Sequence, residues 1–379
     1  MNSPLAIYIH WPFCVSKCPY CDFNSYPGLG LDEGRMKAAL VSELEHFANE
    51  TGPRTVSSIF FGGGTPSLMT PQTISDLIEA VKRLWGLADD PEITMEANPT
   101  SAESDSFQGF GEAGVNRLSL GVQSFDDRSL AFLGRLHSAS EAVSALELAA
   151  RHFPRISFDL IYGLPGQGLE HWQRELKSAL NYVEGHVSLY QLSVEPGTGF
   201  HKSGIREVDQ DMAARLYETS LSLLEENGLT AYEISNFAVT GEECRHNLRV
   251  WRGADYVGAG PGAHGRITTN RGTVAASQTA DPESWLEMAE NCGHGTAERK
   301  TLSPAERLEE ILMLGLRLAE GIGRARFLEL TGYELEEAFD GERLRALTDG
   351  GFLVLDESGL RATGAGRLRL DAVLAALLA

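Results

Sequence analysis

Three of the five cysteines stand close together near the start of the chain, at Cys14, Cys18 and Cys21. The other two, Cys244 and Cys292, are far away in the sequence. An odd number of cysteines with one tight cluster is typical of metal ligation rather than of a set of disulfides. We therefore expect the first three thiols to act together as ligands, in preference to three structural thiols near a strand end.

The spacing of these cysteines, C-x3-C-x2-C, supplies three thiolates, which are soft ligands that suit iron–sulfur clusters or zinc. A structural zinc site and a fully ligated [4Fe–4S] cluster each use four protein ligands. His10 is a candidate for the fourth, although a histidine at a strand end is more often packed or hydrogen-bonded than ligating. Three thiolates on a [4Fe–4S] cluster leave one iron open to a bound molecule. The pattern thus predicts a cluster that does chemistry on a ligand.

The elements that must position these residues are short apolar runs alternating with amphipathic helical patterns. Thr70 followed by Pro71 is typical of a helix start. Strand, helix and strand in succession predict right-handed crossovers and a parallel sheet. We expect six strands, fewer than the eight of a closed barrel, and hence a partial (β/α)6 barrel that is open laterally, with a doubly wound sheet as the alternative. The predicted strands are residues 5–9, 58–61, 93–96, 117–120, 156–161 and 187–192, and the predicted helices are 33–49, 71–85, 141–152 and 170–183.

Four of the predicted strands end in segments unlike plain loops. These segments are residues 62–65, 97–99, 121–125 and 163–165. In parallel α/β architectures, sites are built at the carboxyl ends of the strands. We therefore expect the chemistry to collect on one rim of the barrel.

The second half of the chain is less regular. Residues 209–227 predict a long helix and 232–237 a short extended run, whereas 240–300 are hard to assign. S-P-A-E at 303–306 is a capping box that opens an apolar helix to about residue 319. Helical patterns at 326–330 and 343–347, a hairpin formed by 352–355 and 360–362, and a last helix through 378 resemble a winged-helix module. The fold class is therefore α/β, with a partial barrel (1–200), a barrel extension (201–300) and a small C-terminal winged-helix-like α+β domain (301–379).

Charge and composition exclude several classes of function. The 379 residues include 32 basic and 53 acidic side chains, for a net charge of −21, which repels phosphate backbones and anionic lipid. Residues 301–379 hold 9 basic and 14 acidic side chains, so we expect this domain to pack or bind a partner rather than read DNA. No run approaches 18 apolar residues, and the first residues lack a signal-peptide pattern. We expect a cytoplasmic protein without nucleic-acid partners or membrane-spanning segments.

The cysteine motif, directly after a first strand and before an aromatic-rich segment, resembles that of the radical S-adenosylmethionine (SAM) superfamily. Further matches are G-G-G-T-P-S at 62–67, E-A-N-P at 96–99, N-R-L-S-L-G-V-Q-S-F at 116–125 and D-L-I-Y-G-L-P at 159–165. The resemblance implies a [4Fe–4S] cluster on Cys14, Cys18 and Cys21, whose open iron is chelated by SAM. It also implies a reductive cleavage of SAM to a deoxyadenosyl radical.

The resemblance also implies which residues contact the cofactor. Gly63 and Gly64 allow backbone groups to approach the methionine moiety because no Cβ stands in the way. Glu96 can accept hydrogen bonds from ribose hydroxyls or an ammonium, and Arg135 can pair with a carboxylate. The full set of expected cofactor contacts is Tyr8, Tyr20, Gly63, Gly64, Thr65, Glu96, Gln123, Arg135 and Asp159.

Within the superfamily, nearly the whole chain resembles the branch that contains oxygen-independent coproporphyrinogen dehydrogenase and a related heme chaperone. The dehydrogenase has another cysteine where this chain has Phe23, and a long extension where only 13 residues precede the first ligand here. H-N-L-R-V-W at 246–251 resembles the chaperone's heme-associated H-N-x-x-Y-W segment, with Val250 in place of the tyrosine. By this resemblance His246 is the first candidate for a heme ligand, and Cys244 is the second.

These expectations describe a heme chaperone-like radical SAM protein that binds heme and transfers it to acceptor proteins. The alternative is coproporphyrinogen III dehydrogenase, which decarboxylates propionates oxidatively, while the acidic charge disfavours a radical enzyme acting on tRNA. Whether the chain is an enzyme stays open, because SAM cleavage can persist as a gate or a vestige. The resemblance also implies a low-potential electron donor, such as flavodoxin or ferredoxin, and a homodimer.

Overall fold

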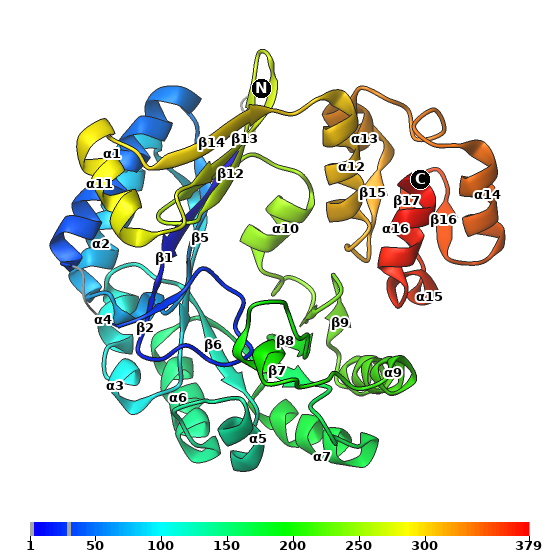
Figure 1. The fold of residues 1–379 in the computed structure, drawn as a ribbon, viewed down its shortest axis with the longest axis horizontal. Coiled ribbons are helices and arrows are strands. Elements are labelled where there is room, and N and C mark those ends of the chain that lie inside the picture. The colour runs from blue at the N-terminus through cyan, green and yellow to red at the C-terminus, as the bar shows by residue number, and fades with distance from the viewer. Residues whose placement is uncertain (1–3, 29–31, 379) are drawn as a thin grey trace.

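The centre of the fold is a curved sheet of parallel strands, shown in Figure 1 by a computed structural model that describes residues 4–28 and 32–378. The six predicted strands are confirmed and lie side by side in chain order. They are β1 (Leu5–Trp11), β4 (Val56–Gly63), β5 (Leu87–Ala97), β6 (Arg117–Gln123), β7 (Arg155–Tyr162) and β8 (His186–Gln191). All neighbouring pairs among them are parallel, as crossovers through helices require.

Alternation along each strand separates an apolar outer face from a polar inner face. On β7, Phe158 and Leu160 are buried in the main hydrophobic core, whereas the intervening Asp159 is not part of it. The helices that cover the outer face are α1 (Glu33–Thr51), α2 (Pro71–Trp85), α4 (Phe107–Glu112), α6 (Ala139–His152) and α7 (Leu169–Ala179). Because successive side chains of a strand point to opposite faces, the inner face is free to carry polar residues.

Helix starts follow the local sequence closely. The Thr70 side chain accepts a hydrogen bond from the Thr73 amide, with Pro71 at the first helical position, as predicted. Ser138 and Glu141 form a capping box at the start of α6. The helix predicted over 170–183 is shorter than expected, because α7 ends at Ala179 and a 3-10 turn, η2 (Leu180–Tyr182), follows.

Residues 240–300, which the sequence left unassigned, extend the sheet beyond β1. A seventh parallel strand, β11 (Tyr256–Ala259), pairs with β1, and β12 (His264–Thr269), β13 (Gly272–Gln278) and β14 (Thr296–Thr301) follow in antiparallel order. The expected count of six strands is therefore too low. β11 is only four residues long and includes Gly258, at which a Cβ would lie 1.9 Å from the His264 carbonyl oxygen, so close strand packing excludes any side chain there.

The other edge of the sheet carries a smaller addition. Instead of one extended run at 232–237, two short strands, β9 (Thr230–Ala231) and β10 (Asn236–Ala238), pair antiparallel with each other and with β8. The terminal strands β14 and β9 do not pair with each other, so the barrel is open laterally, as expected. Two helices of this region are α9 (Gln210–Glu226), close to its predicted bounds, and α10 (Arg245–Trp251), which lies on the inner side of the sheet (Figure 1).

The C-terminal part has its own hydrophobic core and an α+β composition, as predicted. Ser303 and Glu306 form the expected capping box, but α12 (Pro304–Gly315) ends four residues earlier than predicted. The predicted hairpin is confirmed as β16 (Leu353–Leu355) and β17 (Gly359–Ala362), to which β15 (Ile322–Gly323) adds a third strand. The helices around this sheet are α13 (Arg324–Thr331), α14 (Gly341–Asp349), α15 (Gly364–Arg367) and α16 (Leu370–Leu378).

The remaining elements are short, with one longer helix. They are β2 (Phe13–Cys14), β3 (Tyr26–Pro27), η1 (Pro66–Leu68), α3 (Ser101–Ser104), α5 (Asp127–Phe132), α8 (Gly199–Lys202) and α11 (Pro282–Cys292). None of the helices in the described ranges combines the length and the apolar character that spanning a bilayer requires.

Candidate functional site

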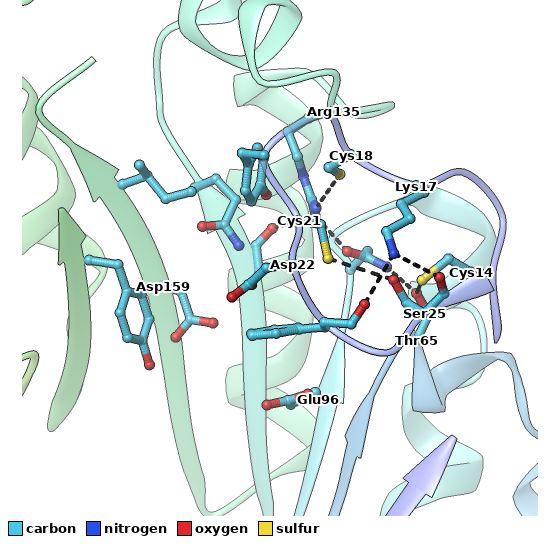
Figure 2. A pocket seen from close by; sticks show the side chains of 18 of the residues that line it. Cys14, Lys17, Cys18, Cys21, Asp22, Ser25, Thr65, Glu96, Arg135 and Asp159 are labelled. Carbon is cyan, nitrogen blue, oxygen red and sulfur yellow. Dashed lines mark hydrogen bonds between the residues drawn. The ribbon is translucent and has the colours of Figure 1, made fainter. Parts of the chain in front are cut away.

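The carboxyl ends of the parallel strands surround a cavity of about 410 Å³ (Figure 2). Eleven of the residues predicted from the sequence line it, although they come from six separate segments of the chain. They are Cys14, Cys18, Tyr20, Cys21, Gly63, Gly64, Thr65, Glu96, Gln123, Arg135 and Asp159. The expectation that the strand-end motifs meet on one rim therefore agrees with the fold.

The loop that carries the cysteines is held from several sides. The Lys17 ammonium donates to the carbonyl oxygens of Phe23 (3.1 Å) and Ser25 (3.0 Å), which ties the loop across its own width. The Pro19 carbonyl accepts a hydrogen bond from the Phe200 amide at 2.8 Å. A Cβ on Gly134 would lie 2.7 Å from the Pro19 ring, so a glycine is required where the loop rests on the segment after α5.

Each cysteine of the loop has a hydrogen-bonding partner of its own. Thr65 donates to Cys14 Sγ at 3.4 Å, the Arg135 guanidinium donates to Cys18 Sγ at 3.5 Å, and the Ser25 hydroxyl lies 3.6 Å from Cys21 Sγ. Donors of this kind stabilise thiolates and tune the potential of an iron–sulfur cluster. The three half-buried thiols therefore have the donor chemistry of cluster ligands.

The arrangement differs from a site for a single metal ion. Within the described ranges, no group of three or more histidine, cysteine, aspartate or glutamate side chains converges closely enough to hold one ion. Both ring nitrogens of His10 are occupied: Nε2 donates to the Asn24 carbonyl at 2.9 Å, so Nδ1 accepts from the Tyr8 hydroxyl at 3.0 Å. His10 is thus packed and hydrogen-bonded, and it supplies no fourth ligand.

Two glycines at the end of β4 form a close wall of the cavity. Gly63 has a φ of 113°, and a Cβ there would lie 2.5 Å from the His10 ring. A Cβ on Gly64 would lie 2.7 Å from the Phe13 carbonyl oxygen. A side chain at Gly63 would displace the His10 ring and one at Gly64 would displace the backbone of Pro12 and Phe13, so only glycine lets main-chain groups line the cavity here.

Arg135 is the main cationic group beside the cysteine loop. Besides Cys18, its guanidinium donates to Asn98 Oδ1 at 2.5 Å and to the Gly121 carbonyl at 2.7 Å, while its buried Nε has no hydrogen-bonding partner. An unpaired buried donor of a cation is costly unless a ligand accepts from the site. Nearby, Gln123 has a φ of 70°, the one positive value for a non-glycine residue in the described part of the chain. Such strain is typical of binding sites.

Two carboxyl groups face each other across the inner wall, Glu96 at the end of β5 and Asp159 on β7 (Figure 2). Burial and the neighbouring Asp159 raise the pKa of Glu96 to about 8, although its Oε2 accepts from the Gly63 amide at 3.2 Å. Burial raises the pKa of Asp159 to about 6, against the lowering effect of the Ser188 hydroxyl and of Arg117. An empty cavity at neutral pH therefore holds a protonated Glu96 beside an ionised Asp159.

Tyr8 and His246 are the two predicted cofactor contacts that the structure does not bring to this cavity. The Tyr8 ring stacks on Phe60 with 6.1 Å between centroids, one layer deeper in the barrel. His246 lies on α10 with only 5% of its surface exposed, and its Nδ1 is 3.1 Å from the Ser58 hydroxyl. Burial lowers the pKa of His246 to about 4, so the imidazole is neutral.

Cys244, the second candidate heme ligand, is equally enclosed. Its thiol donates to Glu92 at 3.6 Å, and burial raises the pKa of the thiol to about 12. The thiolate form that binds iron is therefore disfavoured here. Both Cys244 and His246 belong to a polar layer below the cavity, in which Glu92 also accepts from the His246 amide at 2.9 Å.

Several lining residues were not predicted from the sequence. Asn98 links Thr65, whose hydroxyl it contacts at 3.2 Å, to Arg135, and it was part of a motif that the sequence had already singled out. Tyr190 comes two positions after Ser188 on β8, so the alternation of the strand would have placed both on the inner face. Phe23 is 62% exposed and lines the mouth of the cavity, for which the sequence holds no local signal.

Comparison with known proteins agrees with this geometry. Residues 8–179 match the radical SAM superfamily, and residues 302–369 match the HemN C-terminal domain. The chain is 43% identical to the radical S-adenosyl methionine domain-containing protein 1, mitochondrial, of Bos taurus, with 98% of this chain and 87% of that protein covered. It is 36% identical to the heme chaperone HemW of Escherichia coli (strain K12), with 99% and 98% covered.

The fold has a close counterpart among solved structures. The coproporphyrinogen III oxidase HemN from Escherichia coli, described as a radical SAM enzyme, superimposes with a TM-score of 0.84 at 22% identity, covering 99% of this chain and 90% of HemN. That likeness concerns the fold, whereas the full-length sequence matches concern the family. With relatives at 36% to 43% identity over nearly its whole length, this chain belongs to the radical SAM superfamily and, within it, to the HemW-like group of heme chaperone-like proteins.

Proposed function

We propose that this protein binds heme and passes it to acceptor proteins, and that it carries a [4Fe–4S] cluster with SAM on the open iron. The observation that supports the heme function is the full-length similarity to proteins named heme chaperone HemW, at 36% identity in both Escherichia coli and Haemophilus influenzae. The cavity supports the cofactors, because its three thiols, its glycine wall and its unpaired Arg135 donor suit them.

In this proposal Cys14, Cys18 and Cys21 hold the cluster, and their three hydrogen-bond donors keep the thiolates stable. The backbone at Gly63, together with Glu96, Arg135 and Asp159, holds SAM. The other predicted contacts in the cavity, Tyr20, Gly64, Thr65 and Gln123, complete its lining. A reduced cluster with SAM bound supplies one-electron cleavage of the C–S bond of SAM.

The partners follow from the same proposal. A low-potential electron donor such as flavodoxin or ferredoxin reduces the cluster, and a heme-acceptor protein receives the heme. A homodimer and a cytoplasmic location stay predictions, and some relatives are named mitochondrial. The net charge of −21 continues to argue against nucleic acid as a partner.

The two candidates for the heme iron ligand lie in the polar layer below the cavity. His246 and Cys244 stay candidates, but each is buried and already hydrogen-bonded, to Ser58 and Glu92 respectively. For His246 to reach a heme iron, α10 has to move away from β4.

The test uses anaerobically reconstituted protein in two parallel assays. In the first, heme is titrated and its absorbance followed, and apomyoglobin is then added as a generic acceptor; saturable binding followed by transfer is expected. In the second, coproporphyrinogen III is supplied with SAM and a low-potential reductant, and no protoporphyrinogen is expected. Turnover to protoporphyrinogen without saturable heme binding would replace the proposal by the dehydrogenase alternative.

A further inference from the structure

A second cavity, of about 750 Å³, lies between the barrel edge and the C-terminal part of the chain. It is lined by residues of α9, by Gln191 at the end of β8, and by residues 367–372, which run from the end of α15 into α16, and we call it the C-terminal cleft. Figure 1 shows α15 facing α9 across this region. Its volume falls in the range of small-molecule sites. Gln191 also lines the cavity beside the cysteines, so the two cavities are neighbours.

Arg317 projects into the C-terminal cleft from the segment after α12. Its guanidinium lies 4.6 Å from the centroid of the Trp251 ring, and one of its nitrogens donates to Glu233 at 3.0 Å. Its buried Nε has no hydrogen-bonding partner. Trp251 is the last residue of the H-N-L-R-V-W segment, so this segment supports Arg317 at the cleft, whatever the role of His246.

Arg367 faces the same cleft from α15. Within residues 4–28 and 32–378, its half-buried side chain forms no ion pair or hydrogen bond. Both Arg367 and Arg317 act on the Tyr217 phenol, where they oppose the rise in pKa that burial causes. The phenol itself donates to the Ile234 carbonyl at 3.2 Å. Two guanidinium groups thus approach one phenol, with a single buried carboxylate, Glu233, to balance them.

The cleft also has acidic residues, and their positions limit their effect on these arginines. Glu207, Asp211, Glu218 and Asp371 are all exposed on the rim of the cleft. Glu207 accepts from the Val194 amide at 2.7 Å, and Asp211 and Asp371 lie in the first turns of α9 and α16, where acids favour the helix dipole. The deeper wall is therefore cationic and the rim is acidic.

We infer that the C-terminal cleft binds the carboxylate side chains of a tetrapyrrole, with Arg367 and Arg317 as the groups that hold the two carboxylates. This inference rests on the proposed heme function and gives it a location. Guanidinium groups bind carboxylates through paired, charge-assisted hydrogen bonds, and the unpaired Arg367 and the one-third-exposed guanidinium of Arg317, of which one nitrogen is bonded to Glu233, have that capacity. Apolar lining from Val208, Ile234 and Leu368 offers contact for the ring.

The lining also bears on how firmly heme is held. Among its described residues the cleft has no histidine, cysteine or methionine; of the known axial ligands of heme iron it offers only the phenols of Tyr162 and Tyr217, and the Tyr217 hydroxyl already donates to the Ile234 carbonyl. Heme held by its carboxylates and by ring contacts leaves more readily than heme with two axial ligands. Weak axial ligation suits a protein that must hand heme on.

The test compares hemin with hemin dimethyl ester, whose carboxylates are blocked. Both are titrated into wild-type protein, Arg367→Ala and the control Arg343→Ala, which removes an exposed arginine of α14 in the same C-terminal part. We expect Arg367→Ala to weaken hemin binding about tenfold or more and to leave ester binding unchanged, because one charge-assisted pair is lost. Arg343→Ala should bind both as wild type does. Circular dichroism and urea unfolding show whether each variant is folded. If Arg367→Ala does not fold, Arg367→Lys is used in its place.

The outcomes separate this inference from the proposed function. Wild-type protein that binds no hemin saturably would refute the function. Two results would refute binding of the carboxylates in the C-terminal cleft but leave the proposed heme function intact. One is hemin binding that is unchanged in Arg367→Ala. The other is wild-type binding that is equally strong for hemin and its dimethyl ester. Equal weakening of hemin and ester in Arg367→Ala would assign Arg367 a purely structural role and would also refute the inference.

Discussion

Binding of SAM should release about one proton from the cavity at pH 7. The empty cavity holds Glu96 with a pKa of about 8 and Asp159 with a pKa of about 6, both raised chiefly by burial. SAM has a positive sulfonium, and a cation beside buried carboxyl groups favours their ionised forms. The proton of Glu96 should therefore leave when SAM binds.

The size of the effect follows from these two pKa values. At pH 7, Glu96 is about 90% protonated and Asp159 about 10%, so full ionisation releases about one proton. At pH 9 the same calculation leaves about 0.1 proton to be released. The same pKa shift makes the stability of the protein depend on pH. Because folding raises the pKa of Glu96 from 4.5 to about 8, the protonated carboxyl group contributes its full stability below about pH 4.5. That contribution is lost as the pH rises through about 8.

The measurement is isothermal titration calorimetry of SAM into anaerobically reconstituted protein, in phosphate, HEPES and Tris at the same pH. The slope of the observed enthalpy against the ionisation enthalpy of the buffer gives the number of protons released. Glu96→Gln is the matched variant, because its side-chain oxygen can still accept from the Gly63 amide but cannot titrate. It should release about 0.9 proton fewer than wild type at pH 7, because Asp159 and the ammonium of SAM, which must lose a proton to bind iron, contribute equally in both proteins.

Two results would refute the reasoning. If wild-type protein shows no dependence on buffer at pH 7, Glu96 either is ionised before SAM binds or stays protonated afterwards. If Glu96→Gln releases as many protons as wild type, the proton comes from another group, and the assignment of Glu96 as a contact of SAM loses its support.

Three further outcomes are expected. Cys18→Ala should lose the cluster, so that iron analysis after reconstitution falls from about four per chain, and stoichiometric zinc without iron in wild type would contradict the cluster. Arg135→Ala should bind SAM more weakly by about 1.5–3 kcal/mol, or tenfold and more, in equilibrium dialysis; unchanged affinity would remove Arg135 from the contacts. Gly63→Ala should destabilise the fold by about 1–3 kcal/mol in urea unfolding, because φ is 113° and the new Cβ would meet the His10 ring; a stability equal to wild type would show that the wall can yield.

Local patterns in the sequence were sufficient to predict most strands and helices of the barrel and to predict that the cavity residues lie together. Period-2 and period-3.6 alternation depends only on near neighbours, so the six strands β1, β4, β5, β6, β7 and β8 and the caps at Thr70 and Ser303 were predictable. The strand-end motifs could be placed together because the carboxyl ends of parallel strands share one edge of a sheet. The three cysteines needed no tertiary information, since their spacing alone brings them into one loop.

Contacts between distant segments were decided by the tertiary structure alone. Arg135 donates to Cys18 across 117 positions, and β11 pairs with β1, where Tyr256 lies opposite Ala6, a partnership that no local pattern reports. Tyr8 has the polar hydroxyl of a contact residue, yet the register of β1 with β4 sets it one layer below the cavity, beside Phe60.

The cationic wall of the C-terminal cleft is a further case, because Arg317 and Arg367 are 50 positions apart and line the same cleft only in the folded chain. A sequence pattern reports which face a residue takes on its own element. It does not report which other element that face meets, because that depends on how all the buried surfaces pack together at once.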